Sequence, residues 1–348
     1  MKDQPLVSVI CLCYKHEKFV KAALESVIFQ TYPSIELLIV DDASSDQSVA
    51  RIQEFIVEVP QYALAFSDDL LKAQRAGLRV EFIPNPQNLG NCRSFNQALK
   101  LARGKYLIDL AADDLLLDFR VAHQVEIFEQ LDASYGVVFS NTLDIDPEGK
   151  ALRYHYPIDS RGKSLRKIPS GDVYEEILRR YFISTPSMMI KKKVLDELGG
   201  YDENLSYEDF DFWVRASRKY KFYYQDEVTT QKRVLKKSHS SGFSQKKNNP
   251  HLESTLTVCH KAFQLNQTDS EHQALSRCVA YHLRQAFFTE NFELVKQYHI
   301  LLKKIPVPIS RMSKVIVLFS RLRLPVSILY GVYLRFLQIM RRFTRFSF

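Results

Sequence analysis

The sequence is poor in the residues that break or cross-link a chain. Its 348 residues include only 11 glycines and 13 prolines, too few for a long low-complexity linker. The five cysteines are an odd number and lack the spacing of a zinc site or of a secreted disulfide framework. We therefore expect reduced, buried thiols in a cytoplasmic protein and no redox role for them.

Long apolar runs are also missing. No stretch reaches the ~18 uncharged apolar residues of a membrane-spanning helix, and the nearest candidate, residues 315–337, is interrupted by Arg321, Arg323 and Pro325. Residues 1–5 lead directly into a strand pattern without an apolar h-region, so we expect no signal peptide.

Acidic residues are absent from the last part of the chain. The net charge is +8, and from residue 301 onward there are ten Lys or Arg and no Asp or Glu. This asymmetry indicates an anionic partner, either phospholipid or nucleic acid. Basic and apolar residues of the tail, 306–348, alternate at helical spacing, which is typical of a helix lying in a membrane interface. Packing against the protein itself or against a partner subunit is the alternative.

Strand and helix patterns alternate through the first part of the chain. Strands are predicted at 6–12, 35–40, 79–83, 105–110 and 136–139, and helices at 16–29, 44–57, 92–102 and 119–131. A polar insertion is expected at 60–78. The alternation predicts an α/β fold with a parallel sheet, whose ligands bind beyond the C-terminal ends of the strands. Asp41-Asp42 and Asp113-Asp114, which each follow a strand, should then lie on one rim.

The second part of the chain changes character. A helix at 173–181, a strand at 187–190, a short helix ending at Gly199-Gly200 and a helix at 210–219 are predicted. Beyond residue 250 only helices are expected, at 251–265, 271–288 and 292–304. We place a boundary near 247–250. The helices after it can complete an acceptor site or mediate self-association.

Three carboxylate pairs are candidates for chemistry. Asp41-Asp42 can hold a metal, cap a helix or accept a hydrogen bond from a ligand. Asp113 and Asp114 repel each other, and a divalent cation bridging a diphosphate would offset that repulsion; a solvated loop or a helix N-cap is the alternative. Glu208-Asp209 can supply a general base for a hydroxyl nucleophile or simply favourable acids at a helix N-terminus.

Two further motifs contain groups suited to phosphate. In Asn88-Leu89-Gly90-Asn91, the glycine lets the backbone approach a ligand, and Arg93 beyond it suits a diphosphate. A plain turn before a helix is the alternative. His239 lies in a small-residue loop with lysines and can meet a metal or a phosphate, or be an ordinary surface residue.

The order of these motifs resembles glycosyltransferase family 2. The resemblance covers residues 5–245 and rests on four segments: VSVICLCYKHEKFVKAALESVIFQTYPSIELLIVDDASSD, NLGNCRSFNQALKLARGKYLIDLAADD, TPSMMIKKKVLDELGGYDENLSYEDFDFWVRAS and KSHSSGFS. It implies a GT-A fold, a Rossmann-like, mostly parallel sheet flanked by helices, here with a C-terminal helical extension. It also implies a hexosyltransferase that inverts the anomeric carbon. Residues 1–248 would then form the catalytic domain (1–115 nucleotide-binding half, 116–248 acceptor half), followed by a helical region, 249–305, and the membrane-associating tail, 306–348.

The resemblance also implies site residues. Cys13 and Tyr14 would line the nucleotide base pocket, and Asp42 would accept a hydrogen bond from a uracil or thymine ring N–H. Gly90, Arg93 and Asp113 would contact the ribose and the diphosphate. Asp113, Asp114 and His239 would form a Mg²⁺ or Mn²⁺ site. Asp209 would be the base, with Glu208 as competitor, and Thr185 and Pro186 would lie on the acceptor side.

Two positions depart from the family pattern. Ala111 stands where the usual Asp-x-Asp-Asp has its first acid, so we expect altered ribose contact, and Lys15 stands where the family often has Asn. The overall prediction is metal-dependent transfer from a UDP- or dTDP-sugar to a glycan or lipid-linked glycan in bacterial cell-surface polysaccharide or lipopolysaccharide synthesis. The enzyme would be cytoplasmic and peripheral on the inner face of the cytoplasmic membrane, and it can be a homo-oligomer. A catalytically idle nucleotide-sugar-binding scaffold, suggested by Ala111, is the alternative. A nucleic-acid binder is not expected, because the basic charge lies in an apolar-rich tail.

Overall fold

A computed structural model describes residues 4–68, 71–72, 75, 77–235 and 239–326, without the side chains of residues 63 and 239–241. Packing divides the chain into two compact units, described separately below. The first contains residues 1–174 and 181–236, and the second contains 175–180 and 237–348.

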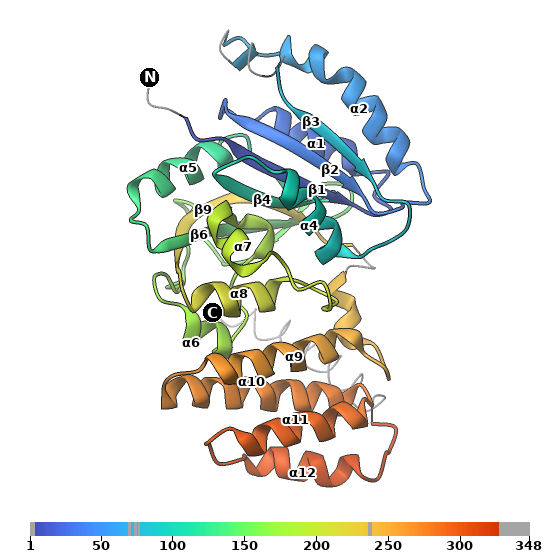
Figure 1. Cartoon of the computed structure of the whole chain (residues 1–348), viewed down its shortest axis with the longest axis vertical. Helices are drawn as coiled ribbons and strands as arrows, with labels where there is room; N and C mark the ends of the chain where they lie inside the picture. The colour runs from blue at the N-terminus through green and yellow to red at the C-terminus, as the bar shows by residue number, and fades with distance from the viewer. Residues whose placement is uncertain (1–3, 69–70, 73–74, 76, 236–238, 327–348) are drawn as a thin grey trace. The chain divides into compact units, whose positions relative to one another are not determined.

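The first unit contains one mixed sheet in the order β3-β2-β1-β4-β8-β6-β9-β5, with β7 paired to β6 (Figure 1). Its strands are β1 (Val7–Cys13), β2 (Ile35–Asp41), β3 (Val80–Pro84), β4 (Tyr106–Ala111), β5 (Leu115–Leu116), β6 (Tyr135–Ile145), β7 (Ala151–Tyr154), β8 (Met189–Lys191) and β9 (Lys221–Arg233). The run β3-β2-β1-β4 is parallel throughout, and β6 is parallel to β9. The predicted α/β class and GT-A architecture are confirmed.

The helices of this unit close both faces of the sheet. They are α1 (Val20–Ile28), α2 (Ser48–Ala63), α4 (Asn91–Leu101), α5 (Arg120–Gln130), α7 (Lys192–Leu198) and α8 (Asp209–Ser217). One core joins α1, α2 and α5 to alternate residues of β1 and β4, among them Val9 and Ile108. Because side chains alternate along a strand, Ile10 and its β4 neighbour Asp109 face the opposite side, where α4 packs.

Two local predictions were wrong. Residues 60–78 are not simply a polar insertion, because α2 continues through Pro60 to Ala63 and Arg75 is fully buried. The Arg75 guanidinium donates to the carbonyl oxygens of Ile28, Gln30 and Tyr32 at 2.7, 2.8 and 2.6 Å. These bonds tie the segment to the turn before β2. The 13-residue strand β9 was missed, since its sequence, KFYYQDEVTTQKR, mixes buried and polar positions without strict alternation.

The second unit is helical. It includes α6 (Tyr174–Arg179, from residue 175), the 3-10 helix η2 (His239–Ser244), α9 (Pro250–Leu265), α10 (Asp269–Phe288), α11 (Phe292–Lys304) and α12 (Arg311–Ser320). Asn249 caps α9, its side chain accepting from the Leu252 N–H at 3.0 Å, and Thr268 and Glu271 form a capping box at α10. The predicted helices 251–265, 271–288 and 292–304 are confirmed to within two residues.

In the described part of the chain, no helix is long and apolar enough to cross a membrane. Of the predicted tail, 306–326 is described and contains α12, whereas 327–348 lies outside the described residues.

Candidate active site

The carboxyl ends of the parallel strands bring the predicted acidic pairs to one edge of the sheet. Cys13 at the end of β1 lies opposite Asp41 in β2, and Leu12 lies opposite Ala111 in β4. The residues that follow these strands, Asp42 and Asp113-Asp114, therefore leave the sheet at the same rim, as predicted.

Asp42 organises the loop that precedes α4. Its Oδ1 accepts from Asn85 Nδ2 at 2.9 Å and from the Leu89 N–H at 2.8 Å, and its Oδ2 accepts from the Gly90 N–H at 2.9 Å. Gly90, at φ +83°, has the left-handed backbone that favours glycine. A carboxylate offers about four lone-pair positions, so Asp42 keeps acceptor capacity for a ligand.

The loops after β1 and β2 are strained beside this site. Lys15 and Ala43 both have positive φ, +60° and +61°, and the Lys15 N–H donates to Ser44 Oγ at 2.9 Å. Such conformations of non-glycine residues concentrate at functional sites. Cys13 is buried, which raises the pKa of its thiol to about 12, whereas Tyr14 is 42% exposed. Of the two predicted pocket residues, Tyr14 therefore presents the accessible side chain.

Asp113 and Asp114 differ in environment. Asp113 is partly exposed, whereas Asp114 is buried and its Oδ1 accepts from the Arg233 N–H at 2.8 Å. Burial, and then the neighbouring charge of Asp113, raise the pKa of Asp114 to about 8. A bound cation would offset the effects of burial and of the neighbouring charge by favouring the ionised carboxylates. The pair therefore has the electrostatic character expected of a metal site.

Arg233, at the end of β9, holds this acidic loop and was missed from sequence. Its Nε donates to the Asp113 carbonyl at 3.0 Å, and its Nη1 donates to the carbonyls of Asp146 and Pro147 at 3.0 and 2.8 Å. The guanidinium also lies 4.6 Å from the centre of the Phe19 ring. Its only sequence signal is an arginine at the end of a strand that was itself not predicted.

The described residues contain no group of three or more His, Cys, Asp or Glu side chains able to hold a metal alone. This suits Mg²⁺ or Mn²⁺ carried with a diphosphate, because such ions are bound by one or two carboxylates together with phosphate oxygens. Asp113 and Asp114 are the residues that would hold such an ion. His239 begins η2 in the second unit, and its side chain lies outside the described residues, so its metal role stays a prediction.

Glu208 and Asp209 begin α8 and face different partners. Glu208 Oε2 accepts from Asn91 Nδ2 at 2.6 Å, and Asp209 Oδ2 accepts from Thr185 Oγ1 at 3.3 Å. Burial, followed by the charge of Glu208, raises the pKa of Asp209 to about 7. Burial also raises the pKa of Glu208. Asp209 is therefore poised to exchange a proton near neutral pH.

Thr185 and Pro186 are positioned by a buried arginine of α5. Arg120 Nη1 donates to the Pro186 carbonyl at 2.7 Å and to Thr230 Oγ1 at 2.7 Å, and its Nη2 donates to the Met188 carbonyl at 2.9 Å. These bonds fix the 3-10 helix η1 (Thr185–Ser187) against the sheet, which brings Thr185 to Asp209. The two predicted acceptor-side residues thus lie in one short segment, and Thr185 of that segment contacts the candidate base, Asp209.

The loop between α7 and α8 is anchored on α4. The Asn96 side chain accepts from the Tyr201 N–H at 2.9 Å and donates to the Tyr201 carbonyl at 2.8 Å, while the Tyr201 ring stacks on Phe95 at 4.2 Å. Predicted Arg93 is exposed and its Nε lies 3.8 Å from Glu203 in the same loop. The donor-side helix α4 and the loop leading to Glu208-Asp209 are therefore linked directly.

The glycines of this loop offer a matched stability test. Gly199 and Gly200 both have positive φ, but a Cβ added at Gly200 would lie 2.3 Å from Asn96 Oδ1, whereas one at Gly199 meets nothing within 4 Å. We expect Gly199→Ala to cost about 1 kcal/mol of unfolding free energy for its backbone strain, and Gly200→Ala to cost roughly 1–3 kcal/mol more for disturbing Asn96. Urea unfolding of both variants measures the difference, and equal losses would contradict the Asn96 anchor.

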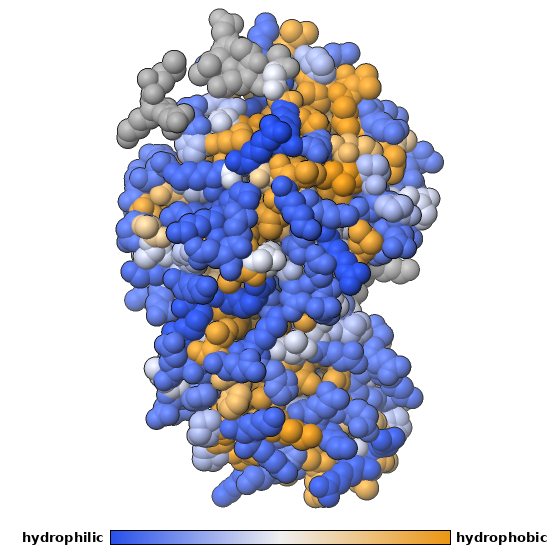
Figure 2. Space-filling view, in the orientation of Figure 1, coloured by the Kyte–Doolittle hydropathy of each residue, from blue (hydrophilic) through white to orange (hydrophobic). Residues whose placement is uncertain are grey.

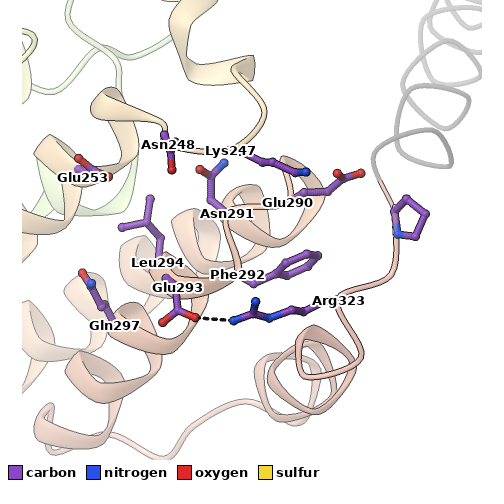
Figure 3. Close-up of a pocket in the computed structure, with 11 residues that line it drawn as sticks. Lys247, Asn248, Glu253, Glu290, Asn291, Phe292, Glu293, Leu294, Gln297 and Arg323 are labelled. Carbon is purple, nitrogen blue, oxygen red and sulfur yellow. Dashed lines mark hydrogen bonds and ion pairs between the residues drawn. The ribbon is translucent and has the colours of Figure 1, made fainter.

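A pocket of about 500 Å³ belongs to the second unit (Figure 3). Its lining includes three carboxylates and two cations, and Glu293 pairs with Arg323 at 2.8 Å. None of the residues predicted to hold donor, metal or acceptor lines it. Because its lining is mixed in charge and largely exposed to solvent, this pocket does not offer the paired carboxylates found at the rim of the sheet.

Comparison with known proteins identifies the class of enzyme. The family model "Glycosyl transferase family 2" matches residues 8–199, and the chain therefore belongs to this family and is a glycosyltransferase. It is 32% identical over 223 residues to an uncharacterized glycosyltransferase of Methanocaldococcus jannaschii, covering 63% of this chain and 68% of that relative. It is 26% identical to an uncharacterized glycosyltransferase of Rickettsia typhi, of whose length it spans 64%.

Solved structures share the fold. The S. aureus TarS fragment 1-349 in complex with UDP-GlcNAc matches with a TM-score of 0.62 and 14% identity, over 92% of this chain and 88% of that one. The mannosyltransferase PcManGT of Pyrobaculum calidifontis, in complex with GDP-Man and Mn2+, matches with a TM-score of 0.55 and 15% identity, over 94% and 87%. At these identities the likeness establishes the architecture, and the chemistry of this chain rests on its own residues.

Proposed function

We propose that this glycosyltransferase transfers a sugar, with inversion, from a UDP- or dTDP-sugar to an acceptor hydroxyl in a metal-dependent reaction. The observation that carries the proposal is the common rim, where Asp113 and the buried Asp114, whose pKa is raised, follow β4 while Asp42 holds the loop of Gly90. A nucleotide diphosphate with its cation is the ligand class whose charge this arrangement suits. Isothermal titration of UDP with and without Mn²⁺ tests it directly, and binding that ignores the metal would count against it.

The proposed chemistry assigns one proton transfer to the chain. The acceptor oxygen attacks the anomeric carbon as its bond to the diphosphate breaks, and Asp209 takes the acceptor proton. The divalent cation, when bound, offsets the negative charge that builds on the leaving diphosphate. Thr185 holds Asp209 Oδ2, and the Phe210 N–H donates to Oδ1 at 2.6 Å, so the carboxylate is oriented before substrate arrives.

The choice of uracil or thymine follows from Asp42 and from structural neighbours. Asp42 retains acceptor capacity that suits a pyrimidine ring N–H, and TarS has been solved with UDP and with UDP-GlcNAc. Tyr14 offers an exposed ring at the end of β1 on which a base can stack. Thermal-shift comparison of UDP, dTDP and GDP tests this assignment, and preference for GDP would contradict it.

Protonation of Asp209 should produce the acidic limb of the pH–rate profile. Its pKa is raised to about 7, so kcat/KM should fall as pH drops below 7, because a protonated Asp209 cannot accept a proton. Glu208 contributes to that raised pKa through its negative charge. Glu208→Gln should therefore lower the pKa of Asp209 and move the limb to lower pH, measured by initial rates from pH 5 to 8. A limb that stays in place would remove Glu208 as the cause.

The acceptor is proposed to be a glycan or lipid-linked glycan of a bacterial surface polysaccharide, met at the cytoplasmic face of the membrane. The support lies on α12, where apolar side chains project from the second unit. The exposed set is Met312, Val315, Leu318 and Phe319 on α12 and Leu322 just after it, while Ile316 faces inward. Figure 2 shows apolar surface among hydrophilic side chains at the end of this unit where α12 is drawn in Figure 1. With Arg311, Lys314 and Arg321 alongside, the surface suits an anionic lipid interface.

Vesicle binding tests this surface. Replacing Leu318 and Phe319 by serine should weaken sedimentation with phosphatidylglycerol vesicles by roughly tenfold, since each loses apolar burial in the interface. Exposed Ile300 on α11 is the matched control, because Ile300→Ser removes a similar side chain outside the α12 surface. Each basic residue near the anionic surface contributes about 1 kcal/mol to binding, and binding should therefore also weaken as the salt concentration rises. Equal binding of all three proteins would contradict a lipid role for α12.

A further inference from the structure

A fully buried arginine of α5 holds the short segment 185–188 at two points. Arg120 is 0% exposed, and burial lowers the pKa of its guanidinium to about 9, so the group stays charged at neutral pH. Its Nη1 donates to the Pro186 carbonyl at 2.7 Å, and its Nη2 donates to the Met188 carbonyl at 2.9 Å. Hydrogen bonds from a charged donor are strong, and the planar guanidinium fixes their directions. The position of the segment therefore depends on one side chain.

The same segment contacts α8 at two places, one helical turn apart. Thr185 Oγ1 donates to Asp209 Oδ2 at 3.3 Å, and Trp213 Nε1 donates to Met188 Sδ at 3.3 Å. Residues four apart lie on one side of a helix, so both contacts are made by the side of α8 that carries the proposed base. Arg120 is thus connected to Asp209 through the segment that it holds.

The loop that would hold the metal is fixed by a different arginine. The Arg233 N–H donates to Asp114 Oδ1 at 2.8 Å, and Arg233 Nε donates to the Asp113 carbonyl at 3.0 Å. Arg120 reaches the same strand, β9, at Thr230, whose Oγ1 accepts from Nη1 at 2.7 Å. A change at Arg120 should therefore disturb the segment beside the base more than the loop beside the donor.

We propose that Arg120 is a positioning residue for sugar transfer, which orients Asp209 through Thr185 and Met188 and contributes little to donor binding. The inference rests on the proposed function, because the role of Asp209 as base belongs to it. A base must lie within hydrogen-bond reach of the acceptor proton, and a displacement of about 1 Å can cost roughly 100-fold in rate. Lysine in place of Arg120 keeps the charge but lacks the planar fork that holds both carbonyls.

Arg120→Lys should lower kcat by roughly 10- to 100-fold, while the affinity for UDP with Mn²⁺ changes by less than about threefold. UDP release from a UDP-sugar donor measures the rate, and calorimetry of UDP with Mn²⁺ measures the affinity, both on the full-length chain. A substitution that only loosened the fold would lower both quantities.

A double-mutant cycle shows whether Arg120 acts through Thr185. Thr185→Val removes the hydrogen bond to Asp209 and should lower kcat by roughly tenfold. Because Arg120→Lys already disturbs this bond, adding Thr185→Val to it should cause little further loss. Losses that multiply in the double variant would contradict the proposed connection.

Arg75→Lys is the matched control. Arg75 is also fully buried, and its guanidinium donates to carbonyl oxygens between the end of α1 and β2. Its replacement should lower the unfolding temperature by an amount similar to that of Arg120→Lys but leave kcat unchanged. A matching fall of kcat in Arg75→Lys would mean that general destabilisation, rather than the hold on the segment, reduces the rate.

Amide hydrogen exchange measures the hold on the segment without turnover. The N–H groups of Ser187 and Met188 donate to carbonyls one turn earlier in the chain, and both should exchange roughly tenfold faster in Arg120→Lys. If that variant does not fold, Gln124→Met takes its place. It removes the bond from Gln124 Nε2 to the Ser187 carbonyl at 2.8 Å and should give the same pattern with smaller losses.

The outcomes separate this inference from the proposed function. Unchanged exchange at Ser187 and Met188, or equal losses of kcat and of UDP affinity in Arg120→Lys, would overturn the role of Arg120. UDP binding that ignores Mn²⁺, or no UDP release by the unmodified protein, would instead overturn the proposed function. The exchange measurement would then still decide whether Arg120 holds the segment.

Discussion

Asp209→Asn should lower turnover by about 10²–10⁴-fold while leaving UDP affinity nearly unchanged, because general-base assistance is commonly of that size. The replacement is nearly isosteric. The amide oxygen can accept from the Phe210 N–H in place of Oδ1, and the amide NH2 in place of Oδ2 can donate to the Thr185 hydroxyl, so the start of α8 should keep its geometry. Initial rates with a UDP-sugar donor, together with UDP titration, separate the loss of chemistry from loss of binding.

Glu208→Gln is the decisive partner variant. Glu208 lies next to Asp209 but is held by Asn91, so we expect its removal to shift the pH profile with only a modest loss of maximal rate. Asp196→Asn serves as the unrelated carboxylate control. If Asp209→Asn kept near-normal turnover while the turnover of Glu208→Gln was almost abolished, the base would be Glu208 and the assignment of Asp209 would be wrong.

Asp114→Asn should reduce Mn²⁺-dependent UDP binding by at least about 100-fold, because a metal ligand and its charge are both lost. The amide can still accept from the Arg233 N–H. Burial raises the pKa of Asp114 to about 8, whereas an unfolded Asp titrates near ~4. The ligand-free protein therefore loses stability as pH rises from ~4 to about 8, and the full cost is present above pH 8. The ligand-free variant should therefore unfold at the same or a higher temperature than the unmodified protein above pH 8.

This combination distinguishes a metal ligand from a structural carboxylate. Reduced UDP binding together with reduced thermal stability would mean that Asp114 only supports the loop. The same experiment addresses the catalytically idle scaffold suggested by Ala111. Metal-dependent turnover by the unmodified chain that disappears in Asp114→Asn excludes that alternative, whereas UDP binding without any turnover would favour it.

The fold could be predicted where the pattern of the chain is repetitive. Apolar runs such as 6–12 and 35–40 alternate with helical spacing, and they became β1 and β2 in the parallel part of the sheet. The second part was harder, because β9 pairs with both β6 and β5 and its burial depends on those partners. The helix that was predicted to end at residue 57 continues past Pro60 to Ala63. Tertiary contacts overrode local signals in both places.

The part of the candidate site that could be predicted consists of the paired carboxylates at strand ends. Asp42, Asp113 and Asp114 follow strands, so their common rim followed from topology alone. The contacts of Asp109 and Arg233 could not be found in that way, because each bonds to a partner distant in sequence, Tyr201 and the carbonyl of Asp113 respectively. An acid in the middle of a buried strand was the available signal for Asp109. The roles assigned to His239 and to residues 327–348 remain predictions.

The account depends on carboxylates from separate segments gathering around one cation-bound pyrophosphate. A crystal structure with UDP and Mn²⁺ tests this most directly, since the anomalous signal of manganese locates the ion independently of the nucleotide. We predict the ion at about 2.1 Å from a carboxylate oxygen of Asp113 or Asp114, with both phosphates of UDP on its other side and the base near Asp42. Manganese and UDP bound elsewhere, away from the 113–114 pair, would contradict the proposed site.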